Sequence, residues 1–113
     1  MAAKFVISKA KDGQFFFNLK AGNGEIILTS EMYKAKPSAK NGIESVKKCA
    51  GEEGQYERKT AKNGKEYFVL KAKNHQIIGQ SQMYASAKSR DNGIESVKKN
   101  AAGAAVDDQT VAS

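Results

Sequence analysis

The sequence Asn-Gly-Ile-Glu-Ser-Val-Lys-Lys occurs twice in this chain, at residues 41–48 and again at residues 92–99. The two occurrences are 51 positions apart, and at that offset residues 4–50 align with residues 55–101 without a gap. Roughly half of the aligned positions are identical. A period near 50 residues is typical of a duplicated supersecondary unit. The chain is therefore predicted to be a tandem duplication, and residues 51 positions apart are called mates below.

Each copy begins with three short segments that have strand patterns. In the first copy these segments are residues 5–8, 14–20 and 25–29. Asp12-Gly13 and Asn23-Gly24 separate them and predict two-residue hairpin turns in which both turn residues have positive φ. Alternation along the third segment predicts that Ile27 faces away from its two neighbours. Each copy is thus expected to form a three-stranded antiparallel meander.

A helix follows each meander. Ala39, Ile43, Val46 and Ala50 are spaced by four, three and four residues, which is one face of a helix. Pro37 suits its first turn, with Ser38 or a neighbour as the cap, and the second helix is expected over residues 86–101. Gly42 and Gly93 lie inside these helices, where glycine costs roughly 1 kcal/mol relative to alanine. We interpret them as points of close approach to the sheet.

These elements predict an α+β fold of two tandem βββα(β) repeats. One antiparallel sheet is covered on one face by two helices, with pseudo-twofold symmetry, because a single meander with one helix is marginal alone. The expected organisation is one domain, 1–113, in which residues 4–50 and 55–101 are the repeats and 102–113 a short strand and flexible tail. Its predicted core is Phe17, Leu19, Ile43, Val46 and their mates Phe68, Leu70, Ile94 and Val97.

The net charge of +7 is concentrated in the repeats. The first copy has nine lysines against four acidic residues, and the second has ten basic residues against four. Cys49 is the single cysteine, which excludes an intramolecular disulfide. No apolar run is long enough to span a bilayer, and the first residues lack the pattern of a signal peptide. A cytoplasmic location is expected.

Residues able to carry chemistry are few and isolated. His75 is the only histidine and stands at a predicted turn, without a partner to orient it as a general base. Cys49 has Asn100 as its mate and no nucleophile signature around it. Ser45 and Ser96 have no base near them in the pattern. We therefore predict no catalytic residues, no metal and no cofactor, and an enzyme is the least favoured class.

Two surfaces are candidates for binding. The first is a doubled basic patch on the helices that could bind anions, formed by Lys47, Lys48, Lys98 and Lys99. The second is the sheet face opposite the core, formed by Phe16, Tyr67, Lys20 and Lys71, where aromatic rings can stack bases. The sequence signature of RNA-binding sheets is not met. The favoured hypothesis is a small binding module that contacts nucleic acid or another polyanion weakly. The alternative is a protein-interaction module that acts through the sheet face or its edges.

Three features resemble a known family. They are the segment Phe-x-Leu-Lys-Ala at 17–21 and 68–72, the Met-Tyr pairs at 32–33 and 83–84, and the doubled octapeptide. Together they resemble the YegP-like family of small bacterial proteins, in its duplicated form. The resemblance implies a unit of three strands, a helix and a further strand, with the strands after the helices exchanged between copies. It implies a monomer with an internal pseudo-dimer, and no established activity.

Overall fold

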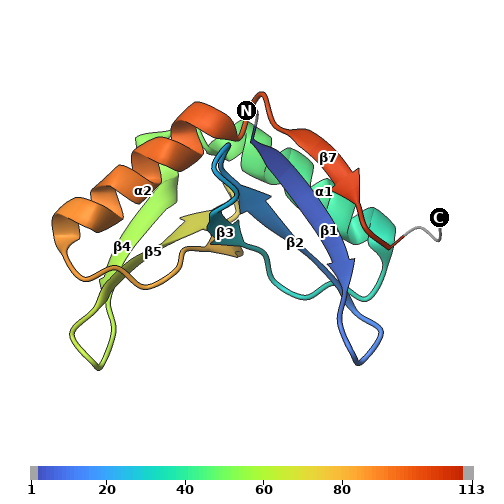
Figure 1. Ribbon diagram of the computed structural model, residues 1–113, viewed down its shortest axis with the longest axis horizontal. Helices are drawn as coiled ribbons and strands as arrows, with labels where there is room; N and C mark the ends of the chain where they lie inside the picture. The colour runs from blue at the N-terminus through green and yellow to red at the C-terminus, as the bar shows by residue number, and fades with distance from the viewer. Residues whose placement is uncertain (1–2, 111–113) are drawn as a thin grey trace.

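A computed structural model describes residues 3–110 of the protein, so the predicted tail at 111–113 lies outside the described residues. The elements in chain order are β1 (Lys4–Lys9), β2 (Phe15–Lys20), β3 (Ile26–Thr29), α1 (Lys36–Cys49), the short 3-10 helix η1 (Glu53–Gln55), β4 (Tyr56–Thr60), β5 (Glu66–Lys71), β6 (Ile77–Gln80), α2 (Ala87–Asn100) and β7 (Ala105–Asp108) (Figure 1).

The described strands form one seven-stranded sheet in the order β4-β5-β6-β3-β2-β1-β7. The two meanders meet where Thr29 of β3 pairs with its mate Gln80 of β6, so the pseudo-twofold axis passes beside this pair. The predicted α+β fold of two repeats in one sheet is confirmed. The prediction that the sheet is wholly antiparallel is wrong, because β7 runs parallel to β1 and makes the sheet mixed.

The parallel pairing follows from where α2 ends. The chain leaves α2 close to the start of β1, and β7 then runs beside β1 in the same direction (Figure 1). The Lys4 ammonium group forms an ion pair with the Asp107 carboxylate at 3.3 Å, and the Lys36 ammonium group forms one with the Asp108 carboxylate at 3.0 Å. Hydrogen bonds from Thr110, together with Lys36, lower the pKa of Asp108 to about 2. The last strand of the second copy is thereby fixed to the first copy.

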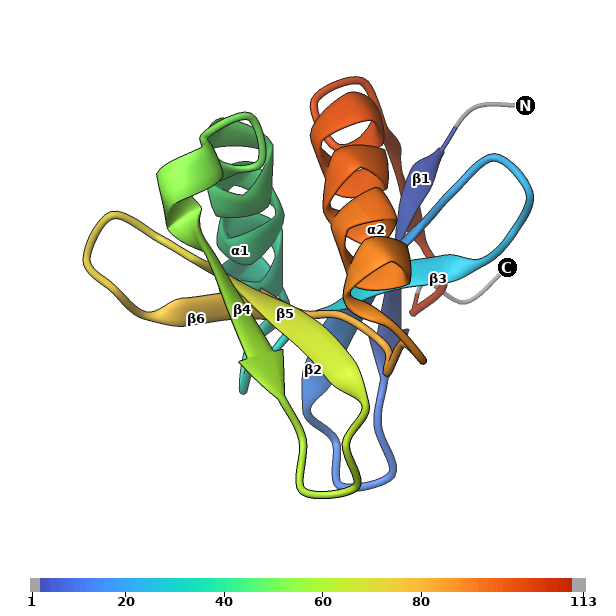
Figure 2. The ribbon, with the colours of Figure 1, turned by 90° about the vertical axis from the view of Figure 1, so that its left-hand side faces the viewer.

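Both helices lie on one face of the sheet (Figure 2). α1 packs on β2, β5 and β6, and α2 packs on β3 and β5, so each helix contacts strands of both copies. All eight core residues predicted from the sequence are buried between the helices and the sheet. The two helices end at the same side of the molecule (Figures 1 and 2).

The first strands of the two copies differ because their positions in the sheet differ. β1 lies between β2 and β7, and Phe5 and Ile7 are both fully buried. β4 is the outermost strand, and its corresponding residues are Tyr56 and Arg58. Within residues 3–110 no strand pairs with the outer edge of β4. Charged side chains on such an edge discourage pairing with other chains.

The hairpin turns differ from the prediction. Each is a four-residue turn, as in the first, where the Gly13 N–H donates to Ala10 O at 3.0 Å. Only the last residue of this turn, Gly13, has a positive φ, which is 86°. The Asp12 carboxylate accepts a hydrogen bond from the Gln14 N–H at 3.0 Å. The predicted two-residue turns were wrong because Asp12 supports an ordinary turn and the following glycine takes the left-handed conformation. In the fourth turn His75 occupies that position with φ 70°.

A register shift in β3 overturns the predicted placement of Ile27. Leu19 pairs with Leu28, but Lys20 pairs with Ile26, so one residue of β3 has no opposite partner. Both Ile27 and Leu28 are consequently buried in the core, whereas Ile26 is 41% exposed. A bulge of this kind breaks the simple alternation on which the prediction rested.

The helix starts are not identical. α1 begins after Ala35, which offers no side-chain cap, and Ser38 lies within the helix, so Ser38 is not the cap. Its counterpart α2 is capped by Ser86, whose hydroxyl accepts the Ser89 N–H at 3.1 Å. Pro37 lies in the first turn of α1, as predicted.

The two helix glycines are explained by a tyrosine in each copy. A Cβ placed on Gly42 would lie 2.4 Å from the Tyr33 hydroxyl oxygen, and one on Gly93 would lie 2.3 Å from the Tyr84 hydroxyl oxygen. Each tyrosine ring stacks on a core phenylalanine, with ring centroids 6.2 Å apart for Tyr33 and Phe17. The close approach is therefore to a side chain that covers the core.

Gly93→Ala should destabilise the protein by about 1–3 kcal/mol, because the methyl group overpacks the contact with Tyr84. In a Tyr84→Ala background the same change should be neutral or stabilising, since alanine is the better helix former by about 1 kcal/mol. Urea unfolding of the double-mutant cycle measures this coupling. Gly103→Ala, with nothing within 4 Å of its added methyl, is the control. An equal loss with and without the Tyr84 ring would contradict the explanation.

Candidate functional site

The sheet face away from the helices lies between two diverging hairpins. The β1–β2 and β4–β5 hairpins point away from the helices and spread apart like the legs of an arch (Figure 1). Since alternate residues of a strand face opposite sides of a sheet, the residues between the buried core positions belong to this surface. We call it the arch face; its residues on the six strands of the two meanders are Val6, Ser8, Phe16, Asn18, Lys20, Thr29, Glu57, Lys59, Tyr67, Val69, Lys71 and Gln80.

The centre of the arch face is polar. Asn18 pairs with Thr29, Thr29 with Gln80, and Gln80 with Val69, so these residues form a row across β2, β3, β6 and β5. The first three are polar, and the fourth, Val69, is apolar and buried. The Asn18 side-chain amide donates to the Thr29 hydroxyl at 2.9 Å. Beside this row, Thr29 and Gln80 line an open depression of about 300 Å³. Hydrogen-bonding groups are thus available on either side of the pseudo-twofold axis.

Phe16 and Tyr67 are mates on this face, and both are half-buried. Phe17 O accepts the Ser30 N–H at 2.9 Å, and Phe15 exchanges hydrogen bonds with Tyr33. Phe16 therefore lies opposite residues 31–32. The sequence reasoning predicted this aromatic pair but missed Met32 and its mate Met83, which are 55% and 44% exposed. The signal that could have found them is the doubled Met-Tyr pair.

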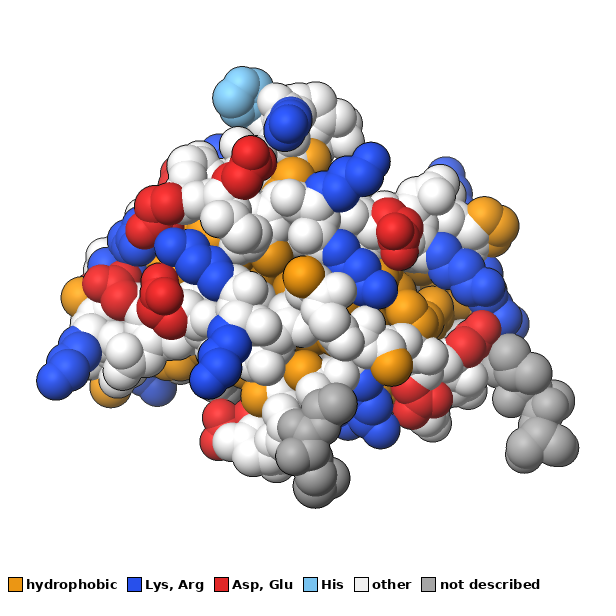
Figure 3. Space-filling view, turned by 90° about the horizontal axis from the view of Figure 1, so that it is seen from above, with side chains coloured by type: hydrophobic (Ala, Val, Ile, Leu, Met, Phe, Trp, Pro, Cys, Tyr) orange, Lys and Arg blue, Asp and Glu red, His pale blue; other side chains and the backbone are white. Residues whose placement is uncertain are grey.

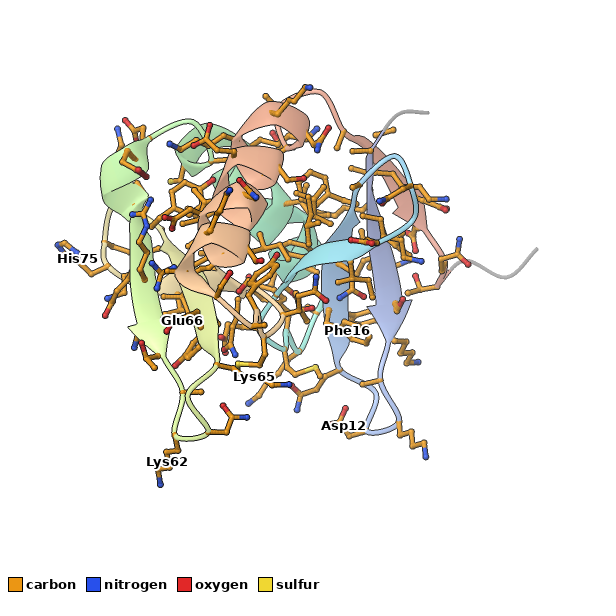
Figure 4. The ribbon with its side chains drawn as sticks, turned by 60° about the vertical axis from the view of Figure 1, so that its left-hand side comes forward. Asp12, Phe16, Lys62, Lys65, Glu66 and His75 are labelled. Carbon is orange, nitrogen blue, oxygen red and sulfur yellow. The ribbon has the colours of Figure 1, made fainter. Side chains whose placement is uncertain are left out.

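Lysines of the two hairpins flank the arch face. They are Lys9 and Lys11 in the first hairpin, and Lys59, Lys62 and Lys65 in the second. Figure 4 shows Lys62 at the tip of the β4–β5 hairpin and Asp12 at the tip of the β1–β2 hairpin. Among the described residues, Lys11, Lys62 and Lys65 make no ion pair and are exposed. The sequence reasoning did not single out these hairpin lysines.

The two sheet lysines predicted for this face are not equivalent. Lys71 pairs closely with Glu57, which also lies 3.7 Å from Lys59. The hydrogen bond from Lys71, together with Lys59, lowers the pKa of the Glu57 carboxyl. Part of the charge of Lys71 is therefore neutralised, whereas its mate Lys20 makes no ion pair within residues 3–110.

The helix lysines predicted as an anion site lie on the opposite surface. Lys47 and Lys98 extend over aromatic rings, each with Nζ 5.9 Å from the ring centroid of Phe5 or Tyr56. Cation–π contact stabilises the ammonium group over such a ring. These contacts account for one lysine of each octapeptide. Lys48 and Lys99 are exposed.

Acidic groups reduce the positive charge near these helix lysines. Lys98 lies 3.4 Å from Glu53 and 3.3 Å from Glu95. Desolvation opposes protonation of Lys98, but the hydrogen bonds with these two carboxylates outweigh it and raise the pKa of Lys98. Figure 3, a view onto this surface, shows lysine and arginine side chains interspersed with acidic ones. All four lysines also lie in the last helical turns, where backbone carbonyls disfavour an anion.

Of the remaining candidates, Cys49 and Ser45 lie close together and His75 lies apart from them. Cys49 is buried at the edge of an open pocket of about 480 Å³ that Ser45 and Lys48 also line. Exposed His75 lies in the turn before β6. In the part of the chain that is described, no three histidine, cysteine or acidic residues form a group that could hold a metal ion. None of the described helices has the length and apolar composition needed to cross a membrane.

Comparison with known proteins shows a match over most of the chain. The domain of unknown function DUF1508 matches twice, at residues 10–57 and 61–108. A UPF0339 protein of Acinetobacter baylyi is 64% identical over 97% of this chain and 99% of its own length. The UPF0339 protein YegP of Escherichia coli is 60% identical over 97% of this chain and all of its own length.

Solved structures agree with these sequence matches. The solution structure of Escherichia coli YegP, described as a protein of unknown function, has a TM-score of 0.91 and covers 96% of this chain and 94% of its own. The solution structure of a UPF0339 protein of Shewanella oneidensis is 54% identical and has a TM-score of 0.90, covering 96% and 92%. The resemblance inferred from the sequence is confirmed, and the chain belongs to the YegP-like UPF0339 family of bacterial proteins, with two DUF1508 domains in tandem.

Proposed function

We propose that this protein is a non-enzymatic binding module that holds single-stranded nucleic acid weakly on its arch face. The observation that carries the proposal is the pair Phe16 and Tyr67, which are mates on one sheet face flanked by the hairpin lysines. Proteins that bind single strands without sequence preference combine a basic surface with rings on which bases stack. The net charge of +7 is complementary to phosphates.

The arch face suits an unpaired strand better than the helix surface does. Stacking needs rings that bases can reach, and the aromatic rings nearest the helix lysines, Phe5 and Tyr56, are both buried. The arch face also offers polar groups beside the axis, at Thr29 and Gln80, for contacts with bases or sugars. The helix patch predicted from the sequence remains the competing location. Both copies lie in one chain, so we propose a monomer, acting in the cytoplasm.

Binding to a fluorescent oligothymidylate, followed by anisotropy, should give a Kd of about 10⁻⁴–10⁻⁶ M at physiological salt and weaken as salt is added. Phe16→Ala combined with Tyr67→Ala should weaken binding by roughly tenfold or more, because one stacked base contributes about 1–3 kcal/mol. Lys48→Ala combined with Lys99→Ala, a matched pair on the helix surface, should leave the affinity nearly unchanged.

A conservative variant distinguishes the loss of aromatic stacking from the loss of the folded structure. Phe16→Tyr combined with Tyr67→Phe keeps both rings and should bind like the natural chain, and thermal unfolding of every variant checks that it is folded. If the helix variant loses binding and the double alanine variant does not, the site lies on the helices. If no variant, nor the natural chain, binds even at low salt, the proposal is wrong.

A protein partner is the second candidate, and the exposure of Met32 and Met83 favours it. Exposed methionines adapt to varied apolar partners. Such binding would depend little on salt, whereas phosphate binding falls steeply with it. The outer edge of β4 is a poorer site for a partner strand, because it carries Glu57, Arg58 and Lys59.

A further inference from the structure

The duplication has preserved the exposed residues of the octapeptide and has changed most residues of the arch face. On the helices, the exposed residues Asn41, Glu44 and Lys48 are identical to their mates. On the arch face, neighbouring positions differ between the copies: Phe16 has Tyr67 as its mate, Asn18 has Val69, and Thr29 has Gln80. The pseudo-twofold relation therefore holds for the backbone of the arch face but not for its chemistry.

The charge around the arch face is also asymmetric. At the depression beside the axis, Glu31 has Gln82 as its mate. In the hairpins, Asp12 has Asn63 and Gln14 has Lys65. Each of these differences makes the second-copy side more positive by one charge. Two acidic residues are introduced in the second copy: Glu57, which is held by Lys71 and Lys59, and Glu66, which is held by Arg90. In the other direction, Lys9 has the uncharged Thr60 as its mate, and Ser8 has Lys59.

A strand of nucleic acid has a direction, and a symmetric surface cannot sense it. Rotation by 180° about a true twofold axis would place a bound strand in the opposite polarity with the same contacts, and hence with the same free energy. An asymmetric surface removes this equivalence, because specificity is a difference between two affinities. The rings at Phe16 and Tyr67 are retained on both sides, whereas the phosphate-attracting charge is concentrated on one side.

We infer that the arch face binds a single strand of nucleic acid in one preferred polarity, with its phosphates held mainly by the β4–β5 hairpin. This inference rests on the proposed function and adds a direction to it. The basic side is formed by Lys62 and Lys65, which are free of ion pairs among the described residues. On the opposite side, Asp12 and Glu31 offset the charges of Lys9 and Lys11, so that side attracts phosphates less. It contacts the strand through Phe16 and Asn18.

Paramagnetic broadening tests this direction. An oligothymidylate that carries a nitroxide at its 5′ end, and a second that carries it at its 3′ end, are each bound to the ¹⁵N-labelled protein. For each label, amide signals of one hairpin should broaden strongly and those of the other weakly, and moving the label should exchange the two hairpins. Equal broadening of both hairpins by both labels would overturn the inference while leaving the proposed function intact. Absence of binding would remove both.

A variant that carries the first copy's charges on the second copy is a second test of the inference. Asn63→Asp, Lys65→Gln and Gln82→Glu place the charges of the first copy on the second, and all three positions are exposed. This triple variant should bind more weakly and lose most of its preference for one label arrangement. If the triple variant kept the preference of each labelled end for one hairpin, these charges would not be what sets the direction of the bound strand. Asn92→Asp on the helix surface changes the net charge without touching the arch face and should keep the preference.

Discussion

Leu28→Gly combined with Gly79→Leu is expected to fold about as stably as the natural chain, although each single substitution is strongly destabilising. The two residues are mates beside the pseudo-twofold axis, where Leu28 pairs with Leu19 and Gly79 pairs with Leu70. A Cβ placed on Gly79 would lie 2.6 Å from Cδ2 of Leu28, which is fully buried. One leucine therefore fills the space that two symmetric positions share.

The magnitudes make this exchange decisive. Truncating a buried leucine to alanine costs about 2–5 kcal/mol, and glycine in a strand adds about 0.5–1 kcal/mol. Gly79→Leu beside the natural Leu28 should cost about 1–3 kcal/mol or more through overpacking. Urea unfolding of both single variants and the exchange variant measures the free energies. If the exchange variant loses the sum of the two single losses, the site is not shared in the way described.

Ile43→Ala and Ile94→Ala should each lower the free energy of unfolding by about 2–5 kcal/mol, because both side chains are buried between helix and sheet. Such a loss is a large share of the roughly 5–15 kcal/mol that stabilises a domain. Lys48→Ala, on the exposed face of α1, should change it by less than about 0.5 kcal/mol. Losses below about 1 kcal/mol at both isoleucines would mean that the helix faces are assigned wrongly.

The repeat made most of the fold predictable. An ungapped offset of 51 residues implies two equivalent meanders and helices, and the buried face of each helix follows from the spacing of Ile43 and Val46. The order of the strands was less accessible, because β7 and β1 are joined by contacts between the two ends of the chain. That pairing is also what makes β1 an apolar interior strand and leaves β4 as a charged edge.

Local departures from regular strand and turn geometry could not be predicted from the alternation of residues or from the turn dipeptides. Alternation cannot show the register shift that buries both Ile27 and Leu28. Turn dipeptides do not distinguish a two-residue turn from the four-residue turn that the Asp12 carboxylate supports. The glycine of the octapeptide was correctly read as a close approach, but its neighbour, Tyr33, is nine residues earlier and reaches Gly42 only in the folded chain.

The candidate site was predicted in part. Alternation along β2 and β5 placed Phe16 and Tyr67 on the face opposite the core, and the structure keeps them there. The flanking lysines could not be singled out, because the sequence alone does not show that the hairpins diverge on either side of this face. The helix lysines stood out in the sequence because they are doubled, but one of each pair is explained by contact with a ring.

Titration of the ¹⁵N-labelled protein with a short oligothymidylate at low salt tests the central claim, that the arch face is the binding surface. The amide signals of β2, β5 and the two hairpin turns are expected to shift, by amounts that shrink as salt is added, and those of α1 and α2 are expected to change little. Shifts confined to the last turns of the helices, around Lys48 and Lys99, would contradict the claim, and so would the absence of any shift.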